Sequence, residues 1–394
     1  MQLILLRHGR TEANENNVIN GRYDSPLSKN GIRELKEISN LYQGVKADFF
    51  FSNSLKRCRD TFDMLFDHKE PDGIMDEFLE RDWGEYEGKR INASSKDMPI
   101  DLYDPGYGAE RFEDFLDRIL KGIRKLNGMG KDKTYLVSTN AGVIKALFMY
   151  FLKIDADKYQ SIRIENGMSY IFNLSVGKDI KLKSYETLNR MPIFVFDEFR
   201  LSFVRHGEST YNKKNLCCGT SDPRLTKEGI EELNDKKSKY RYLEAERYYS
   251  SQMKRAIETF KVIFPENTLY RKYRELEEVY FNGLEGLPMD IKYAQLLFKK
   301  WSKGEKTEIE SIDHVRKRIM QCISWIIDDC INSNVKSAAV FGHGLSMAVF
   351  DSTIKRYDTY DYIKYGILTN GGCRTLYLSN KNGAYIIKNE EVFN

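Results

Sequence analysis

Short apolar runs alternate with helix-like segments along the chain, and the pattern occurs twice. Residues 3–6 (LILL) and 201–204 (LSFV) are mostly apolar, and each run ends at Arg-His-Gly. Residues 47–54 (ADFFFSNS), 134–139 (TYLVST) and 338–343 (AAVFGH) form further runs of this kind. Apolar stretches of this length are typical of buried parallel strands.

Between these runs, apolar positions recur at helical spacing. Residues 27–43 place Ile32, Leu35, Ile38 and Leu41 on one predicted helix face. A second helix is predicted over residues 111–128, closed by Gly128, with a counterpart in the other half of the chain. The two apolar faces contain Phe112, Phe115, Leu116, Ile119, Ile123 and Leu126, and Val315, Ile319, Ile323, Ile326 and Ile327. Repeated β-α alternation predicts a helix-covered α/β sheet with chemistry at the carboxyl ends of its strands.

The two halves are copies of one domain. His8 and His206 lie 198 positions apart, and many other residues keep this offset. They include Asn14 and Asn212, Gly21 and Gly219, Asp24 and Asp222, Gly31 and Gly229, Arg57 and Arg255, Thr61 and Thr259, Glu80 and Glu278, and Gly88 and Gly286. Later the offset drifts, so that Asn166 corresponds to Asn370. We therefore expect two tandem domains, residues 1–192 and 199–394, joined near residues 189–200.

Composition narrows the class of protein. The chain has 394 residues, of which 41% are hydrophobic and 30% charged, as in ordinary globular proteins. A net charge of +4 argues against a nucleic-acid partner, and no apolar run is long enough to cross a membrane. The six cysteines show no CxxC pairing, and the first residues do not form a signal peptide. We expect a cytoplasmic protein with reduced thiols and no metal site, and we leave homo-oligomer formation open.

Five motifs follow one another in the same order in both copies. They are Arg-His-Gly after the first strand, D-x-P/R-L-S/T-x-x-G, S-x-x-L/M-K-R, a Glu…Glu-Gly segment, and a late strand expected to end in histidine. Each match is weak alone, but the ordered and repeated set resembles the histidine phosphatase superfamily, also called phosphoglycerate mutase-like. The resemblance implies two three-layer α/β/α domains with mostly parallel sheets. It also implies phosphoryl transfer on a small phosphorylated metabolite, without a cofactor.

In the second copy the resemblance assigns a role to each motif residue. His206 would be the nucleophile that carries the phosphoryl group, and Glu278 the general acid. Glu278 is preferred to Glu277 because it matches Glu80 across the repeat. The groups expected to hold and stabilise the phosphoryl oxygens are Arg205, Arg255, His343 and Asn212.

The small number of histidines supports the assignment of catalytic roles to those in the motifs. The chain has five histidines, and three of them lie on motif positions. The remaining two, His68 and His314, are expected to be ordinary surface or core residues.

The first copy departs from the family pattern at one position. It keeps His8 and Glu80 as candidate catalytic residues. Its candidate phosphate-binding residues are Arg7, Asn14, Arg57 and Asn140. The resemblance places the second histidine where this chain has Asn140, which can donate a hydrogen bond but carries no charge. The first domain is therefore expected to bind phosphate without turnover, to be slow or of different specificity, or to carry an introduced substitution. We favour an impaired site.

The segment between the acid and the second histidine sets the substrate in the family. It runs from Glu80 to Asn140 and from Glu278 to His343, and both segments are short for a cofactor-dependent mutase. In the second copy, Tyr293, Lys299, Lys300, Trp301 and Lys303 could line a pocket for a phosphorylated sugar. The leading expectation is a phosphomonoesterase. A phosphomutase, or a non-catalytic phosphate-binding module in the first domain, is the alternative.

Overall fold

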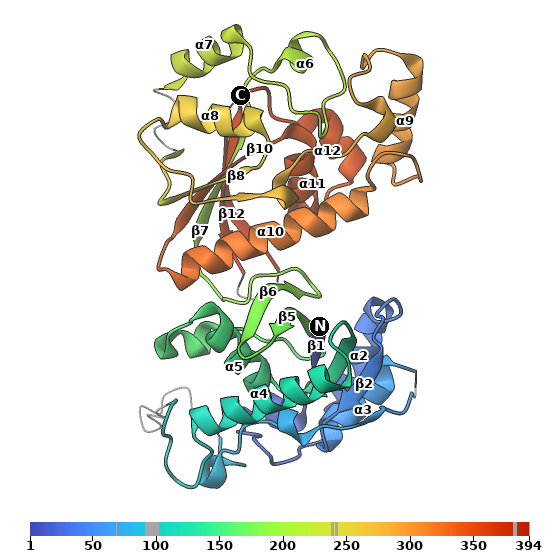
Figure 1. Ribbon diagram of the computed structural model, residues 1–394, viewed down its shortest axis with the longest axis vertical. Coiled ribbons are helices and arrows are strands. Elements are labelled where there is room, and N and C mark those ends of the chain that lie inside the picture. The colour runs from blue at the N-terminus through green and yellow to red at the C-terminus, as the bar shows by residue number, and fades with distance from the viewer. Residues whose placement is uncertain (68, 91–101, 238–239, 241–242, 381–383, 394) are drawn as a thin grey trace. The chain divides into compact units, whose positions relative to one another are not determined.

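The computed structural model consists of two compact units, Met1–Asn189 and Arg190–Asn394 (Figure 1). It describes residues 1–67, 69–90, 102–237, 240, 243–380 and 384–393. His68 and part of the first predicted substrate segment, residues 91–101, lie outside the described residues. As limits of the two domains, 1–192 and 199–394 stay a prediction.

Each unit contains one six-stranded sheet with the same strand order. The orders are β3-β2-β4-β1-β5-β6 and β9-β8-β10-β7-β11-β12. In each sheet four strands run parallel, and two antiparallel strands follow at one edge. The first sheet contains β1 (Gln2–Arg7), β2 (Phe49–Ser52), β3 (Gly73–Ile74), β4 (Thr134–Thr139), β5 (Ser169–Val176) and β6 (Ile180–Thr187). The second contains β7 (Phe199–Arg205), β8 (Arg247–Ser251), β9 (Arg271–Tyr273), β10 (Ser337–Gly342), β11 (Cys373–Ser379) and β12 (Ile386–Phe393).

Helices cover both faces of each sheet (Figure 1). Those of the first unit are α1 (Glu12–Glu15), α2 (Lys29–Ile38), α3 (Lys56–Leu65), α4 (Phe112–Met129) and α5 (Ala141–Leu152). Those of the second are α6 (Thr210–Lys213), α7 (Lys227–Asp235), α8 (Lys254–Ile263), α9 (Lys292–Ser302), α10 (Ile312–Asn332), α11 (Gly344–Lys355) and α12 (Thr359–Gly366). The predicted α/β class with mostly parallel sheets is confirmed.

The side chains of β10 alternate between two cores. Ala338 and Val340 join the core formed with α10 and α11, whereas Ala339 and Phe341 join the core formed with α7 and α8. All four are fully buried, because a strand covered on both faces exposes neither side to water. Burying each large apolar side chain contributes about 1.5–3 kcal/mol. None of the helices in the described part of the chain is long and apolar enough to span a membrane.

Some predicted helix details are wrong. α4 continues past Gly128 to Met129, because a glycine near a helix end can adopt helical dihedral angles at a small cost. α2 ends at Ile38 and a 3-10 turn follows, which changes the period and leaves Leu41 50% exposed. Ile32 is also exposed, so only Leu35 of the predicted face is fully buried.

The segment predicted to join the copies packs on the second unit. Phe194 is fully buried, and its backbone N–H donates to Asp328 Oδ1 at 3.3 Å. Asn380 donates through Nδ2 to the Phe194 carbonyl at 2.8 Å and accepts from the Phe196 N–H at 2.9 Å. Residues of this segment therefore belong to the core of the second unit.

The L-S/T-x-x-G motif fixes the loop that follows the first strand. Ser28 caps α2 by accepting from the Gly31 N–H at 3.0 Å, and Thr226 caps α7 in the same way. A Cβ atom on Gly31 would lie 2.1 Å from the Arg10 carbonyl oxygen, so the helix start could not pack against this loop with any other residue. The motif thus fixes the position of the loop next to the Arg-His-Gly segment.

Candidate active site of each unit

In the second unit, His206 and His343 lie side by side at the carboxyl ends of neighbouring parallel strands. Arg205 on β7 pairs with Gly342 on β10, and the next residue of each strand is a histidine. The His206 N–H donates to the Gly342 carbonyl at 3.0 Å, and the two ring centroids are 5.3 Å apart. Residues far apart in the sequence therefore meet because the strand register ends both strands at the same level.

His206 is buried in a defined protonation state. Its Nδ1 lies 2.7 Å from the Gly207 carbonyl oxygen, which can only accept, so Nδ1 carries the proton. Burial lowers the pKa of His206 well below its ordinary value, and the charges of Arg255 and Arg205 lower it further. The ring is neutral, and Nε2 keeps its lone pair available as a nucleophile.

His343 is held by a serine. Its Nε2 lies 2.8 Å from Ser251 Oγ, whereas Nδ1 has no hydrogen-bond partner among the described residues. Burial lowers the pKa of His343 well below its ordinary value, and Arg255 contributes to the same shift. The ring is fully buried.

Two arginines bring positive charge to this place. The terminal nitrogens of Arg255 donate to the Ser221 carbonyl at 2.6 Å and the Gly219 carbonyl at 2.8 Å. Arg205 donates to the Leu368 carbonyl at 2.5 Å, and burial lowers its pKa. Within the described chain, the Nε of each arginine is buried without a partner. A buried N–H of this kind can bind an anion, because leaving it unsatisfied is costly.

Glu278 lies at the start of α11, the helix that follows His343. Its carboxylate accepts from the Ser346 N–H at 2.9 Å, the Leu345 N–H at 3.1 Å and its neighbour's N–H at 3.0 Å. Free N–H groups at a helix start favour a carboxylate there. The side chain of Glu277 instead lies 4.0 Å from Arg274, and burial raises its pKa.

Asn212 is oriented by its neighbours. Its Oδ1 accepts from the Ser209 N–H at 3.0 Å, the Ser209 hydroxyl at 2.7 Å and Asn370 Nδ2 at 3.1 Å. The amide nitrogen is therefore the group that Asn212 can offer to a ligand.

Arg205, Asn212 and Glu278 line a cavity of about 570 Å³. The remaining walls come from α9, α12, the start of α11 and the loops before α9. Of the residues predicted to shape a substrate pocket, Lys299 lines this cavity.

The prediction was wrong for Trp301 and Tyr293. Trp301 is buried in the core, and Tyr293 is 55% exposed with its hydroxyl donating to Glu308 at 2.7 Å. Neither lines the cavity, and Lys300 and Lys303 are also exposed without lining it.

The first unit places its matching residues in the same way. The His8 N–H donates to the Thr139 carbonyl at 3.0 Å, and His8 Nδ1 donates to the Gly9 carbonyl at 2.7 Å. Burial lowers the pKa of His8 well below its ordinary value. Glu80 accepts from the Gly142 N–H at 3.0 Å, at the start of α5. Arg7 and Asn14 make the same kinds of contact as their counterparts, to the Ile164 carbonyl and to the Thr11 N–H and Asn166 amide respectively.

Asn140 binds Arg57, the arginine that corresponds to Arg255 of the second unit. Its Oδ1 accepts from Arg57 Nε at 3.1 Å and Nη2 at 2.9 Å. The matching Nε of Arg255 has no partner in the described residues. In the first unit, therefore, the side chain that replaces histidine occupies the N–H that the second unit leaves open.

Neighbouring positions differ as well. The serine that holds His343, Ser251, corresponds to Asn53, whose Nδ2 donates to the Phe78 carbonyl at 2.9 Å. Cys58 stands where the second copy has Ala256, and its Sγ lies 3.7 Å from Asn140 Oδ1. On α5, Lys145 replaces an alanine, and burial lowers its pKa to about 8. The surroundings of Asn140 therefore differ from those of His343 at three further positions.

Comparison with known proteins decides the family. The model of the histidine phosphatase superfamily (branch 1) matches residues 3–186 and again residues 201–389. The chain belongs to this superfamily.

Relatives of this chain include both phosphatases and mutases. The uncharacterized phosphatase PhoE of Bacillus subtilis is 29% identical over 164 residues, 41% of this chain and 83% of that protein. A 2,3-bisphosphoglycerate-dependent phosphoglycerate mutase of Bradyrhizobium diazoefficiens is 26% identical over 197 residues, 46% of this chain and 95% of the mutase. The solved phosphoserine phosphatase of Entamoeba histolytica, in complex with 3-phosphoglyceric acid, is 22% identical with a TM-score of 0.41, covering 50% of this chain and 96% of that one. The family and these sequence relatives support a phosphatase or a phosphomutase.

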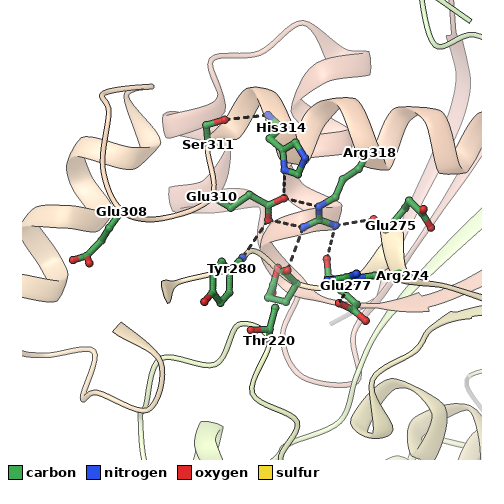
Figure 2. A pocket seen from close by; sticks show the side chains of 11 residues that line it. Thr220, Arg274, Glu275, Glu277, Tyr280, Glu308, Glu310, Ser311, His314 and Arg318 are labelled. Carbon is green, nitrogen blue, oxygen red and sulfur yellow. Dashed lines mark hydrogen bonds and ion pairs between the residues drawn. The ribbon is translucent and has the colours of Figure 1, made fainter. Parts of the chain in front are cut away.

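A partly buried ion pair between Arg318 and Glu310, which the sequence motifs do not include, supports, as a brace, the backbone that carries Glu278. Figure 2 shows the two paired side chains. Arg318 on α10 forms a two-pronged bond with Glu310, at 2.8 and 2.9 Å. The same guanidinium donates to the carbonyls of Glu275 and Glu277 at 2.7 Å and of Glu278 at 3.1 Å. The first unit has the same brace, with Arg118 and Glu110 acting on the backbone of Glu80. The signal in the sequence is a Glu and an Arg eight positions apart in both copies.

Among the described residues, no three His, Cys, Asp or Glu side chains are grouped as a metal site. His314, predicted to be an ordinary residue, is 68% exposed and pairs with Glu310 at 2.6 Å. It lines a second cavity of about 890 Å³ together with the brace (Figure 2).

His206 should stay neutral at pH values where an ordinary histidine is protonated. Its pKa is lowered, so the proton binds only at a pH below the usual value of about 6.5. We expect ¹⁵N shifts of the neutral Nδ1–H tautomer at pH 6, measured by long-range ¹H–¹⁵N spectra and assigned with His206→Ala. An imidazolium signal at that pH would contradict the buried, carbonyl-bound state.

Removing the brace should destabilise the second unit. Arg318→Ala removes the guanidinium that binds the Glu310 carboxylate and three carbonyls, and losing hydrogen bonds to a charged group costs about 1.5–3 kcal/mol. We expect a loss of this size in urea titrations followed by fluorescence in a Trp83→Phe background, where the two remaining tryptophans lie in the second unit. Lys317→Ala, an exposed change on the same helix, is the control and should alter little. Equal stability of both variants would show that the pair is dispensable.

Proposed function

We propose that the second unit is a phosphomonoesterase that hydrolyses a small phosphorylated metabolite through phosphohistidine. The observation that carries the proposal is the neutral, buried His206, with Nε2 available beside Arg205 and Arg255. A nucleophile needs its lone pair, and a phosphoryl group needs donors aimed at its oxygens. Membership of the histidine phosphatase superfamily supports the same chemistry.

In the first step, His206 Nε2 attacks phosphorus and forms an N–P bond while the bond from phosphorus to the leaving oxygen breaks. Arg205, Arg255 and His343 surround the transferring group and donate to its three peripheral oxygens, where negative charge is spread. Asn212 adds its amide N–H. The leaving oxygen takes its proton from Glu278, which gives the free alcohol.

In the second step, water attacks the phosphohistidine from the side that the alcohol has left. Glu278, now a carboxylate, takes a proton from this water as the new O–P bond forms. The N–P bond breaks and its electron pair returns to Nε2. Inorganic phosphate leaves, and His206 is again neutral.

The first unit is proposed to be impaired in this reaction. Asn140 brings no imidazole and accepts the Arg57 N–H groups that a phosphate would need. Losing one donor of this kind typically costs about 100-fold or more in turnover. Asn53 and Cys58 also differ from their counterparts in the second unit, and they lie where a second histidine ring would lie. These additional differences favour natural divergence of the first site over a single introduced substitution.

The function is tested by phosphate release and by the role of Glu278. Wild-type protein should release inorganic phosphate from alkyl and aryl monoesters, and His206→Ala should abolish the release by the second unit. Glu278→Gln should slow alkyl phosphates by about 10²–10⁴-fold and p-nitrophenyl phosphate far less, because an acidic phenol leaves without a proton. The kcat/KM of both substrates, in a His8→Ala background that silences the first unit, gives the ratio.

Two outcomes would contradict the proposal. Equal losses on both substrates would reject Glu278 as the acid and favour Glu277. Isomerised product without phosphate release would favour a phosphomutase.

The defect of the first unit should be partly reversible. In a His206→Ala background, Asn140→His returns one donor and frees Arg57, so activity on p-nitrophenyl phosphate should rise by about 100-fold or more. Adding Asn53→Ser supplies a hydroxyl for the new histidine, as Ser251 does for His343 in the second unit. This change should raise activity further.

Binding measurements make this result interpretable. A folded double variant that still binds inorganic phosphate but gains no activity would mean that the first unit is a binding module. The missing histidine would then not be its main defect.

A further inference from the structure

The cavity of about 570 Å³ beside the second active site has a large apolar surface. Eight of the sixteen residues that line it have apolar side chains. They include Phe281, Met289, Ala294, Phe298, Leu345 and Ile367. These come from α9, the start of α11, the residue after α12 and the loops before α9, so the apolar character does not belong to one element.

Polar side chains also line this cavity. Arg205, Asn212 and Glu278 belong to the candidate phosphate site. Gln295 and Lys299 on α9 are exposed, as is Asn215 in the loop after α6. Cys218 is the remaining polar side chain of the lining.

The wall on α9 is firmly supported. The ring of Phe298 packs 6.2 Å from that of Phe281 and 5.4 Å from that of Trp301, measured between centroids. Trp301 and Ala294 are 1% and 2% exposed and anchor the helix to the core. A wall anchored in this way keeps its shape and favours ligands that match it.

We propose that the second unit takes phosphate monoesters whose alcohol carries an apolar body of about the size of an aromatic ring. The inference rests on the proposed phosphatase function. A sugar would place some of its hydroxyl groups against Phe281, Phe298 and Leu345, which offer them no partner, and burying an unpaired hydroxyl is unfavourable. An apolar body gains from the same contact, since it leaves water for an apolar surface. The cavity therefore selects against the sugar phosphate that the sequence suggested.

The test compares primary alkyl phosphates in a His8→Ala background. We expect kcat/KM for 3-phenylpropyl phosphate to exceed that for glycerol 3-phosphate and glucose 6-phosphate by about tenfold or more. Phe298→Ala should lower the value for 3-phenylpropyl phosphate by about tenfold and change glycerol 3-phosphate less than twofold. Leu296→Ala, on the same helix but 52% exposed and outside the cavity, is the matched control and should change neither.

The outcomes separate the two proposals. Equal or faster turnover of the sugar or glycerol phosphate by the wild type overturns the substrate class. It leaves the phosphatase function intact if p-nitrophenyl phosphate is hydrolysed in a His206-dependent way. No His206-dependent release from any substrate rejects the function itself. If Phe298→Ala does not fold, Met289→Ala removes part of another wall and should produce the same selective loss.

Discussion

In each unit the two central strands run parallel, in a register that ends both at the same level. Arg205 pairs with Gly342, and Arg7 pairs with Thr139. The residue after each strand therefore meets its neighbour across the sheet. The helix that follows the later strand starts at the same place, so its free N–H groups receive Glu278 or Glu80. The candidate nucleophile, the residue after the later strand and the carboxylate come together because of this one pairing, and a slip in register would separate all three.

Many residues repeated at the 198-position offset hold this arrangement without touching the candidate phosphate site. Thr259 Oγ1 accepts from the Gly207 N–H at 2.9 Å and donates to the Arg255 carbonyl at 2.7 Å, which ties the nucleophile's loop to α8. Asp222 accepts from the Lys254 N–H at 2.8 Å at the start of the same helix. Gly88 and Gly286 have φ angles of 74° and 76°, a region that favours glycine. Many of the residues shared by the two copies therefore fix the geometry of the loops around the candidate site.

The sequence predicted well those features that depend on local pattern, such as which residues follow a buried strand. Strand-helix alternation predicted chemistry at the carboxyl ends of the strands, and the family resemblance assigned His206 and His343 to two of these ends. Contacts between distant side chains left weaker signals: Ser251 meets His343 across 92 positions, and Arg318 reaches back 40 positions to the backbone of Glu278. The pocket lining of α9 was wrong for Trp301 because a mixed run of aromatics and lysines does not show which side faces the core. Packing on the sheet decides that orientation, and single-sequence periodicity does not contain it.

The two sites also show why a substitution of one buried polar side chain is usually accompanied by changes in its hydrogen-bond partners. An imidazole in the second unit needs a partner for one ring nitrogen, and Ser251 provides it. An amide at the same position satisfies a different neighbour, because its oxygen accepts from Arg57 and from the Cys58 thiol. Without an imidazole there is no ring nitrogen for a serine to bind, and Asn53, at the position of Ser251, donates to the Phe78 carbonyl. Most buried polar atoms have a partner, so an asparagine at the position of His343 and the contact of its oxygen with Arg57 go together. The first unit keeps the fold and the nucleophile's loop, since these depend on the strand register and not on which ligand occupies the arginine.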